Sequence, residues 1–269
     1  MQQDLRFVKG HGTQNDFVLL PDPDGVLELT PALARAVCDR HAGLGADGVI
    51  RVARDESGRF LMDYRNADGS AAEMCGNGAR LFARYLVDAG WAPPGRIDFV
   101  TRGGVRTAEL GRSGDVLIHM GPVRLGPPST AIVGGAELAG VAVDVGNPHL
   151  VCLIDSDPLE LDLSAAPHVD PAAFPDGANL EVVQPIGEDA VRMRVHERGV
   201  GETRSCGTGT VAAAAAFLAS RQRSTGTVQV QVLGGTVTVS IGDGSSTLTG
   251  PAVVVATGTL DPDGLPGLD

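Results

Sequence analysis

The chain contains one short pattern twice, and this repeat limits the folds open to it. Cys-Gly-x-Gly occurs at 75–78 and again at 206–209, and a Gly-Gly pair begins 28 residues after each cysteine. An asparagine also precedes each cysteine by a similar distance, Asn15 by 60 residues and Asn147 by 59. Chance would not preserve several spacings at once, so the sequence predicts a duplicated domain.

Each half has the same predicted order of elements. Strand-like segments come first, then a helix that begins at Cys-Gly-x-Gly, then two strands joined at the Gly-Gly pair. The alanine run 212–216 is apolar all round, as expected of a helix enclosed by sheet. Short links and hairpins favour antiparallel or mixed sheets. We therefore predict an α+β fold of two pseudo-symmetric domains.

Domain limits follow from the repeat and from the turn residues. Glycines and prolines gather at 121–135, which reads as the inter-domain region. We expect an N-terminal domain over 1–121, to which the last strand within 251–260 returns, and a C-terminal domain over 122–250. The Pro/Gly-rich tail 261–269 is expected to fray.

Composition restricts the partners and the location. The chain has 269 residues, 43% of them hydrophobic, and a formal net charge of −12. A negative chain is a poor partner for nucleic acid or an anionic membrane, and we expect neither. The sequence has no apolar run of about 18 residues and no secretory-type start, so the expected location is the cytoplasm.

Cysteine and lysine usage bears on cofactors. Cys38, Cys75, Cys152 and Cys206 are far apart, without the spacing of a zinc site. Lys9 is the only lysine, and no phosphate-binding motif lies near it, so a pyridoxal Schiff base is excluded. We predict that the protein uses no cofactor and no metal. Cys38 and Cys152 are predicted to pack in the core.

The two remaining cysteines carry the chemistry. Each lies where a helix begins, and there unpaired N–H groups and the positive end of the helix dipole lower a thiol pKa and attract a carboxylate. If both domains close on one amino acid, its α-carbon lies between two sulfurs. One thiolate removes the α-proton and the other thiol returns a proton to the opposite face. Cys75 and Cys206 are therefore predicted to be a pair of acid/base residues.

Four linked motifs, in order over nearly the whole chain, resemble those of the diaminopimelate epimerase family. They are 11–17 (HGTQNDF), 66–70 with 75–80 (NADGS, CGNGAR), 146–149 (GNPH), and 197–199 with 206–209 (ERG, CGTG). The resemblance implies cofactor-independent interconversion of LL- and meso-2,6-diaminopimelate, for lysine and peptidoglycan synthesis. It also implies a homodimer whose domains each wrap a sheet around a central helix.

The resemblance implies a role for each site residue. Cys75 and Cys206 become the acid/bases, and His149 and Glu197 are associated with tuning them. The reacting carboxylate is held by the amides of Gly76, Asn77, Gly207 and Thr208. The remaining substrate contacts, chiefly to the distal amino-acid end, come from Asn15, Asn66, Asn147, Asn179, Glu197 and Arg198.

Simple chemistry agrees with part of this set. A distal zwitterion needs an acid for its ammonium group and an arginine for its carboxylate, and Glu197 with Arg198 supplies both. One position departs from the family, because many relatives have Gln where this chain has Gly48. A side-chain contact is therefore expected to be missing there.

Two other functions remain open. A proline or hydroxyproline racemase uses a similar cysteine pair, but a cyclic imino acid has no distal zwitterion to occupy Glu197 and Arg198. The chain could also be a non-catalytic amino-acid binder, against which stands the retention of both cysteines at matching helix starts. Assays with both kinds of substrate separate these functions.

Overall fold

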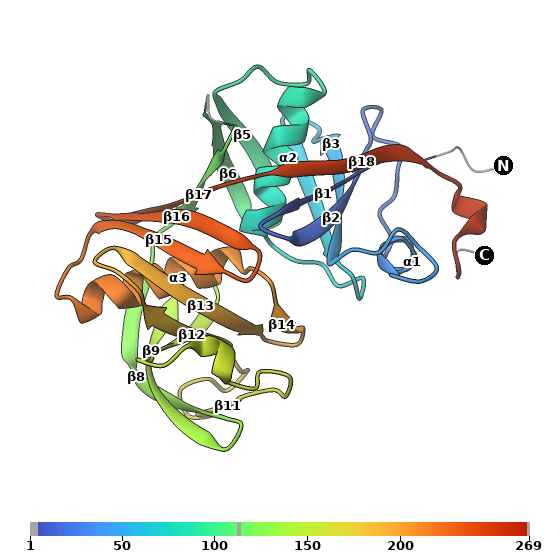
Figure 1. Ribbon diagram of the computed structural model, residues 1–269. Coiled ribbons are helices and arrows are strands. Elements are labelled where there is room, and N and C mark those ends of the chain that lie inside the picture. The colour runs from blue at the N-terminus through green and yellow to red at the C-terminus, as the bar shows by residue number, and fades with distance from the viewer. Residues whose placement is uncertain (1–4, 112–113, 268–269) are drawn as a thin grey trace. The chain divides into compact units, whose positions relative to one another are not determined.

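The computed structural model describes residues 5–111 and 114–267, which form two compact units (Figure 1). The first unit combines the chain up to Ile118 with the segment from Pro251 onward, and the second runs from His119 to Gly250. Each unit is mostly strand and contains one long helix. The predicted α+β class with two similar domains is confirmed.

The first unit is a mixed sheet packed on a helix. Strand β18 pairs antiparallel with β1, and the β2–β3 and β4–β5 pairs are parallel, whereas β1–β2, β3–β4, β5–β6 and β6–β7 are antiparallel. Figure 1 shows β18 beside β1, so the two ends of the described chain meet in one sheet. The elements are β1 (Leu5–Gly12), β2 (Asn15–Pro21), α1 (Pro31–Cys38), β3 (Gly48–Arg54), β4 (Phe60–Asn66), α2 (Gly76–Asp88), β5 (Arg96–Thr101), β6 (Gly104–Leu110), β7 (Val116–Gly121), β18 (Val253–Leu260) and the 3-10 helix η2 (Pro262–Gly264).

The second unit surrounds its helix more completely. Helix α3 contacts β9, β10, β12, β13, β15, β16 and β17, which gives the central helix that the resemblance implies. The β10–β12 and β13–β15 pairs are parallel, and the other pairs are antiparallel. The elements are β8 (Arg124–Val133), β9 (Ala136–Asp144), β10 (Pro148–Leu153), η1 (Pro158–Glu160), β11 (His168–Val169), β12 (Asn179–Pro185), β13 (Ala190–Glu197), β14 (Gly201–Thr203), α3 (Gly207–Ser220), β15 (Gly226–Val232), β16 (Gly235–Gly242) and β17 (Ser245–Gly250).

The helices begin where their sequences predict. Thr30 caps α1 by accepting a hydrogen bond from the Leu33 amide at 3.1 Å, and Pro31 is the first helical residue. Helix α3 is buried on every side from Thr210 to Leu218 because its small apolar residues allow the surrounding strands to approach. Cys75 and Cys206 occupy the N-cap positions of α2 and α3.

Two segments are more ordered than their composition indicates. Most of the predicted inter-domain region 121–135 forms β8, which pairs with β9. The two prolines within β8, Pro127 and Pro128, are accommodated at a register shift between Leu125 and Pro128, where the sheet requires fewer N–H donors. The prediction that the tail 261–269 frays is wrong for its described part, which forms η2 and buries Leu265 in the core beside α1, while residues 268–269 lie outside the described residues.

Candidate active site

Cys206 lies at the start of α3 with its sulfur turned toward the helix. Its backbone is extended (φ −121°, ψ 121°), and the Gly209 amide donates to Sγ at 3.4 Å. The Thr208 hydroxyl lies 3.5 Å from the same sulfur. Gly207 and Thr208 open the helix, so their N–H groups have no partner one turn earlier within α3. The predicted position of this cysteine is confirmed.

The predicted lowering of its pKa is wrong. Burial raises the pKa of the Cys206 thiol well above its ordinary value, and the negative charges of Glu197 and Glu181 raise it further. Hydrogen bonds from Thr208 and Gly209 act in the opposite direction but are outweighed. A helix N-terminus typically contributes 0.3–1 kcal/mol, less than the cost of ionising a fully buried thiol beside two acids. Cys206 is therefore held as a thiol, which suits a proton donor.

Glu197, at the end of β13, is the acid next to this thiol. Its carboxylate accepts a hydrogen bond from the Thr203 hydroxyl and is also hydrogen-bonded with Cys206. Burial raises the pKa of Glu197, and the nearby Glu181 raises it again, whereas the bonds from Thr203 and Cys206 and the charge of His149 lower it. An acid and a thiol whose pKa values are both raised can exchange a proton at a smaller free-energy cost than an ordinary pair.

His149 and Glu181 form a buried pair in the same unit. His149 lies on β10 and Glu181 on the parallel strand β12, and both side chains are 0% exposed. Glu181 Oε1 is 2.7 Å from His149 Nδ1, and Asn147 Oδ1 is 3.0 Å from Nε2. Glu181 is not among the site residues predicted from the sequence. A charged residue within the apolar segment 180–183 was the available signal, because a fully buried glutamate requires a partner.

The strand register brings the other predicted residues of this unit together. His149 is paired directly with Asn179, and Asn179 Oδ1 accepts a hydrogen bond from the Arg198 amide at 2.9 Å. The Arg198 guanidinium donates to the Asp176 carbonyl at 3.0 Å. Asn147, His149, Asn179, Glu197 and Arg198 thus come from three neighbouring strands and the turns beside them.

Cys75 occupies the matching position in the first unit. It is the extended N-cap residue of α2 (φ −134°, ψ 118°) and is partly exposed. Its thiol lies 3.7 Å from Asn15 Oδ1, which also accepts a hydrogen bond from the Asn77 side chain at 3.1 Å. Gly76 and Asn77 are the first residues of α2, like Gly207 and Thr208 of α3. Asn15 therefore links the tip of the β1–β2 hairpin to the cysteine.

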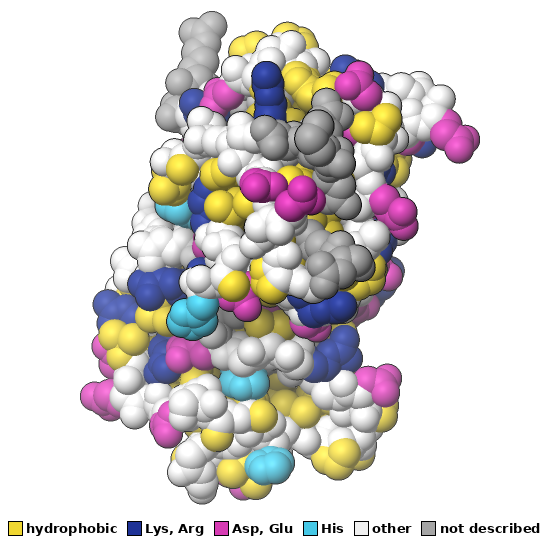
Figure 2. Space-filling model, turned by 90° about the vertical axis from the view of Figure 1, so that its right-hand side faces the viewer, with side chains coloured by type: hydrophobic (Ala, Val, Ile, Leu, Met, Phe, Trp, Pro, Cys, Tyr) yellow, Lys and Arg dark blue, Asp and Glu magenta, His cyan; other side chains and the backbone are white. Residues whose placement is uncertain are grey.

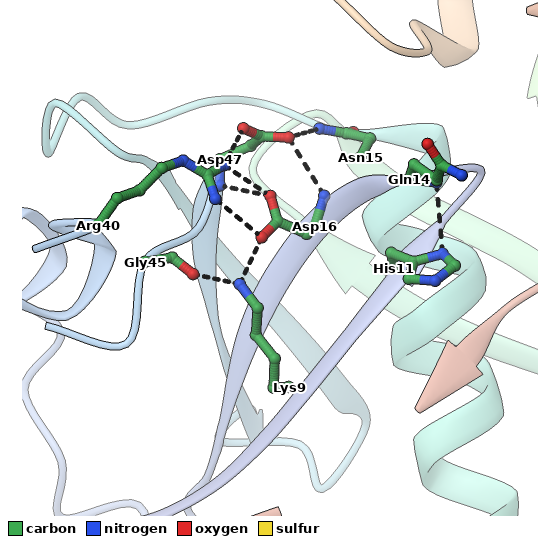
Figure 3. A network of polar contacts seen from close by, with 8 residues as sticks. All are labelled: Lys9, His11, Gln14, Asn15, Asp16, Arg40, Gly45 and Asp47. Carbon is green, nitrogen blue, oxygen red and sulfur yellow. Dashed lines mark hydrogen bonds and ion pairs between the residues drawn. The ribbon is translucent and has the colours of Figure 1, made fainter. Parts of the chain in front are cut away.

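A network of charges fixes the orientation of Asn15 (Figure 3). Its amide donates to Asp47 at 2.7 Å, and Arg40 bridges Asp47 and Asp16 at 2.8 and 2.9 Å. Lys9 is ion-paired with Asp16 and also donates to the Gly45 carbonyl. Burial raises the pKa of Asp16, but hydrogen bonds and charge from Arg40 and Lys9 lower it to about 2. The single lysine thus has a structural role in this network.

A buried arginine lies beneath the hairpin tip. Arg80, in α2, is 0% exposed and donates from Nη2 to Thr13 Oγ1 and Asn77 Oδ1, both at 2.9 Å. Burial lowers the pKa of Arg80 to about 10, so it remains a cation at neutral pH. Gly12 leaves space for it, because a Cβ there would lie 2.8 Å from Nη2. Thr13 has a positive φ of 51°, so the hairpin turn is held in a conformation that non-glycine residues seldom adopt.

The structure explains the departure at Gly48. A Cβ at this position would lie 2.5 Å from the Tyr64 ring, so a longer side chain would not fit. The Tyr64 hydroxyl donates to Asn66 Oδ1 at 2.6 Å, and the Asn66 amide donates to Ser70 at 3.0 Å. Tyr64 therefore occupies the space and orients Asn66, which lies just before the turn that leads to Cys75.

The remaining cysteines are core residues, as predicted. Cys38 and Cys152 are buried, and burial raises the pKa of each thiol to about 12. The described residues contain no group of three or more His, Cys, Asp or Glu side chains placed to hold a metal ion. None of the helices they form is long and apolar enough to cross a membrane. On the face that Figure 2 shows, basic and acidic side chains are interspersed.

Solved structures similar to this chain share its fold at low sequence identity. A phenazine biosynthesis protein of the PhzF family from Bacillus anthracis has a TM-score of 0.74 at 15% identity, over 96% of this chain and 99% of that one. A hydroxyproline epimerase from Agrobacterium vitis, with bound trans-4-hydroxy-L-proline, has a TM-score of 0.68 at 17% identity, over 98% and 95%. These likenesses support the fold alone.

Sequence relatives are much closer. The chain is 50% identical to the diaminopimelate epimerase of Rhodococcus erythropolis (strain PR4 / NBRC 100887), over 95% of this chain and 96% of the relative. It is 48% identical to that of Thermobifida fusca (strain YX), over 95% and 98%. The sequence profile of diaminopimelate epimerase matches residues 7–126 and 141–259. Matches of this extent in both halves show that the chain belongs to the diaminopimelate epimerase family.

Proposed function

We propose that this protein interconverts LL- and meso-2,6-diaminopimelate by proton transfer at the α-carbon, without a cofactor. Family membership supports the substrate. The observation that carries the chemistry is the buried Cys206 thiol at the start of α3, hydrogen-bonded with Glu197, whose pKa is raised too. A two-base epimerase needs one sulfur that arrives as an acid, and this environment keeps Cys206 protonated.

In the proposed reaction the two sulfurs act on opposite faces of the α-carbon. A Cys75 thiolate takes the α-proton, the electron pair passes into the substrate carboxylate, and the Cys206 thiol delivers its proton to the other face. After the reaction Cys75 is a thiol and Cys206 is a thiolate. Glu197 lies next to Cys206 and can return a proton to it or receive one from it. Helix-start amides at 76–77 and 207–208 stabilise the charge on the carboxylate.

The geometry favours dividing the two charged residues between the two ends of the substrate. Glu197 is partly buried and already bonded to Thr203 and Cys206, so we assign it to the reacting end. Arg198 is exposed, and its guanidinium donates to the backbone carbonyls of Asp176 and Gly177, so we assign it to the distal carboxylate. Asn179 positions Arg198 through its backbone amide.

Solvent isotope exchange tests this function. Purified protein is incubated with LL-diaminopimelate in D2O under thiol reductant, and we expect deuterium at the α-carbon together with the meso isomer. L-proline and trans-4-hydroxy-L-proline serve as controls and should not exchange. Exchange of proline alone would replace the proposal by the racemase alternative. Activity that disappears on dialysis against a chelator and returns with metal would refute the cofactor-free mechanism.

We also propose that the enzyme is a cytoplasmic homodimer. The family resemblance supports this state, and three consecutive valines of β18, Val253, Val254 and Val255, expose apolar surface that a second copy would cover. Size-exclusion chromatography with light scattering should give the mass of two chains. A mass of one chain at micromolar concentration would contradict it.

A further inference from the structure

Glu181 is a buried acid that packing alone does not explain. It lies on β12 among Leu180, Val182 and Val183, all 0% exposed, where an apolar side chain would fill the same space without losing hydration. Its Oε1 is bonded to His149 Nδ1 at 2.7 Å, and among the described residues its Oε2 has no hydrogen-bond partner. A buried carboxylate with one unsatisfied oxygen is costly, which points to a role beyond stability.

The first turn of α3 is shaped to accept this acid. Gly209 is packed so closely that a Cβ there would lie 2.5 Å from Glu181 Oε1 and 3.3 Å from its Cδ. The same glycine donates its amide to Cys206 Sγ. The carboxylate of Glu181 therefore lies directly behind the turn that carries the catalytic thiol, and it is fixed from the other side by His149.

The pair also determines which nitrogen of His149 is available. A carboxylate can only accept hydrogen bonds, so the proton between the two groups is on Nδ1. Nε2 is then the ring nitrogen 3.0 Å from the Asn147 side-chain amide: it donates to Oδ1 when the ring carries both protons, and accepts from the amide nitrogen, with the amide group turned over, when only Nδ1 is protonated. An apolar residue at position 181 would leave the ring free to adopt either tautomer.

We propose that Glu181 is a positioning residue of the epimerase, which holds His149 in the tautomer protonated on Nδ1 and so presents Nε2 to the site. The proposal rests on the proposed function for its kinetic consequence, although the tautomer itself does not depend on it. Glu181 is fully buried behind Gly209, so in this proposal it acts through His149 rather than on the substrate itself. A carboxylate that orients a catalytic imidazole in this way has a large effect on kcat and a small one on substrate binding.

The first arm of the test measures the tautomer directly. Protein labelled with ¹⁵N-histidine is studied by NMR, and the His149 signals are assigned by their absence from His149→Gln. In the wild type Nδ1 should carry the proton. In Glu181→Gln, whose amide can donate as well as accept, the Nδ1 and Nε2 shifts should move toward a mixture of tautomers. Asp22→Asn is the matched control, since Asp22 is a buried acid of the first unit bonded to Arg51.

The second arm measures kinetics with diaminopimelate. Glu181→Gln should lower kcat by about 10- to 100-fold and change KM by less than about 3-fold. In the double variant with His149→Gln, Glu181→Gln should lower kcat by less than about a further 3-fold, because a residue that acts through His149 has no imidazole left to orient. Asp22→Asn should keep the wild-type kcat per folded molecule. Should Glu181→Gln fail to fold, Glu181→Asp replaces it, with an expected loss of several-fold and Nδ1 still protonated.

The outcomes separate this proposal from the proposed function. Unaltered His149 shifts in Glu181→Gln would overturn it, and so would full multiplication of the two losses in the double variant. Wild-type protein that fails to epimerise diaminopimelate would remove the proposed function, yet the NMR arm would still decide whether Glu181 sets the tautomer.

Discussion

Gly209 and Gly78 provide a matched test of the contact behind Cys206. Each is the third residue after its cysteine, in the first turn of α3 and α2 respectively. At Gly209 an added Cβ meets the Glu181 carboxylate at 2.5 Å, whereas at Gly78 it meets the Ile50 Cδ1 methyl at 3.0 Å and the Met62 Cε methyl at 3.2 Å. The same Gly→Ala change therefore places a methyl group against the Glu181 carboxylate in one repeat and against the ends of flexible side chains in the other.

The magnitudes follow from these distances. Alanine gains about 0.8–1 kcal/mol over glycine within a helix, at either site. In Gly209→Ala the carboxylate must retreat by about 0.9 Å to reach ordinary contact, which breaks its 2.7 Å bond to His149. A hydrogen bond to a charged group is worth about 1.5–3 kcal/mol, so the net loss is about 0.5–2 kcal/mol. In Gly78→Ala the methyl groups yield by a few tenths of an ångström and the net change is close to zero.

Thermal unfolding and kcat measure both consequences. Gly209→Ala should lower Tm by about 2–6 °C and kcat by at least about 10-fold, because Glu181 and His149 are displaced together. Gly78→Ala should keep Tm within about 2 °C of the wild type. Equal Tm and equal kcat in the two variants would refute the reasoning, since the space behind Cys206 would then not be constrained by Glu181.

Four further outcomes are expected. Cys75→Ala and Cys206→Ala should each abolish epimerisation in an assay of meso-isomer formation, and normal turnover by either would exclude the two-base mechanism. Arg198→Ala should raise KM for diaminopimelate at least about 10-fold, because one charge-assisted contact to the substrate is lost. Unchanged kinetics would show that Arg198 does not belong to the site. Arg80→Met should change the free energy of unfolding in urea by less than about 3 kcal/mol, because removing a buried charge offsets the loss of two hydrogen bonds. The same variant should lower kcat, because the β1–β2 turn and the start of α2 lose the donor that they share. Folded Cys206 keeps its proton above pH 9, where the unfolded thiol loses its own, so stability should fall as pH rises past about 9, and Cys206→Ala should show a shallower fall.

Local rules and the repeat predicted much of the fold. The Thr30 cap, the helix starts at both cysteines and the strands on either side of each Gly-Gly pair all follow from short-range patterns, and the structure has them. Strand β8 could not be predicted in this way, because Pro127 and Pro128 normally argue against a strand. Only its pairing with β9, through a register shift, makes the segment extended.

The electrostatics of the site lay beyond the sequence. A helix start predicts a lowered thiol pKa, and for Cys206 the opposite holds because strands β12 and β13 bring Glu181 and Glu197 next to the sulfur. The positions of Glu181 and Glu197 in the sequence do not predict that they lie close to Cys206. Likewise Arg80 closes the motif that begins at Cys75, but its complete burial depends on the β1–β2 hairpin folding over it.

The pairing of β18 with β1 has a consequence for synthesis on the ribosome. Residues of β1 leave the exit tunnel before the whole second unit, and their partners from Val253 to Leu260 leave after it, so this part of the first sheet cannot close until the second unit has been synthesised. The second unit, by contrast, is one continuous segment that can fold as soon as it emerges. Meanwhile β1 has β2 as its only strand partner and its other edge is unpaired, which is the kind of strand edge that nascent-chain chaperones protect. A chain truncated before β18 should therefore retain a folded second unit and an aggregation-prone first one.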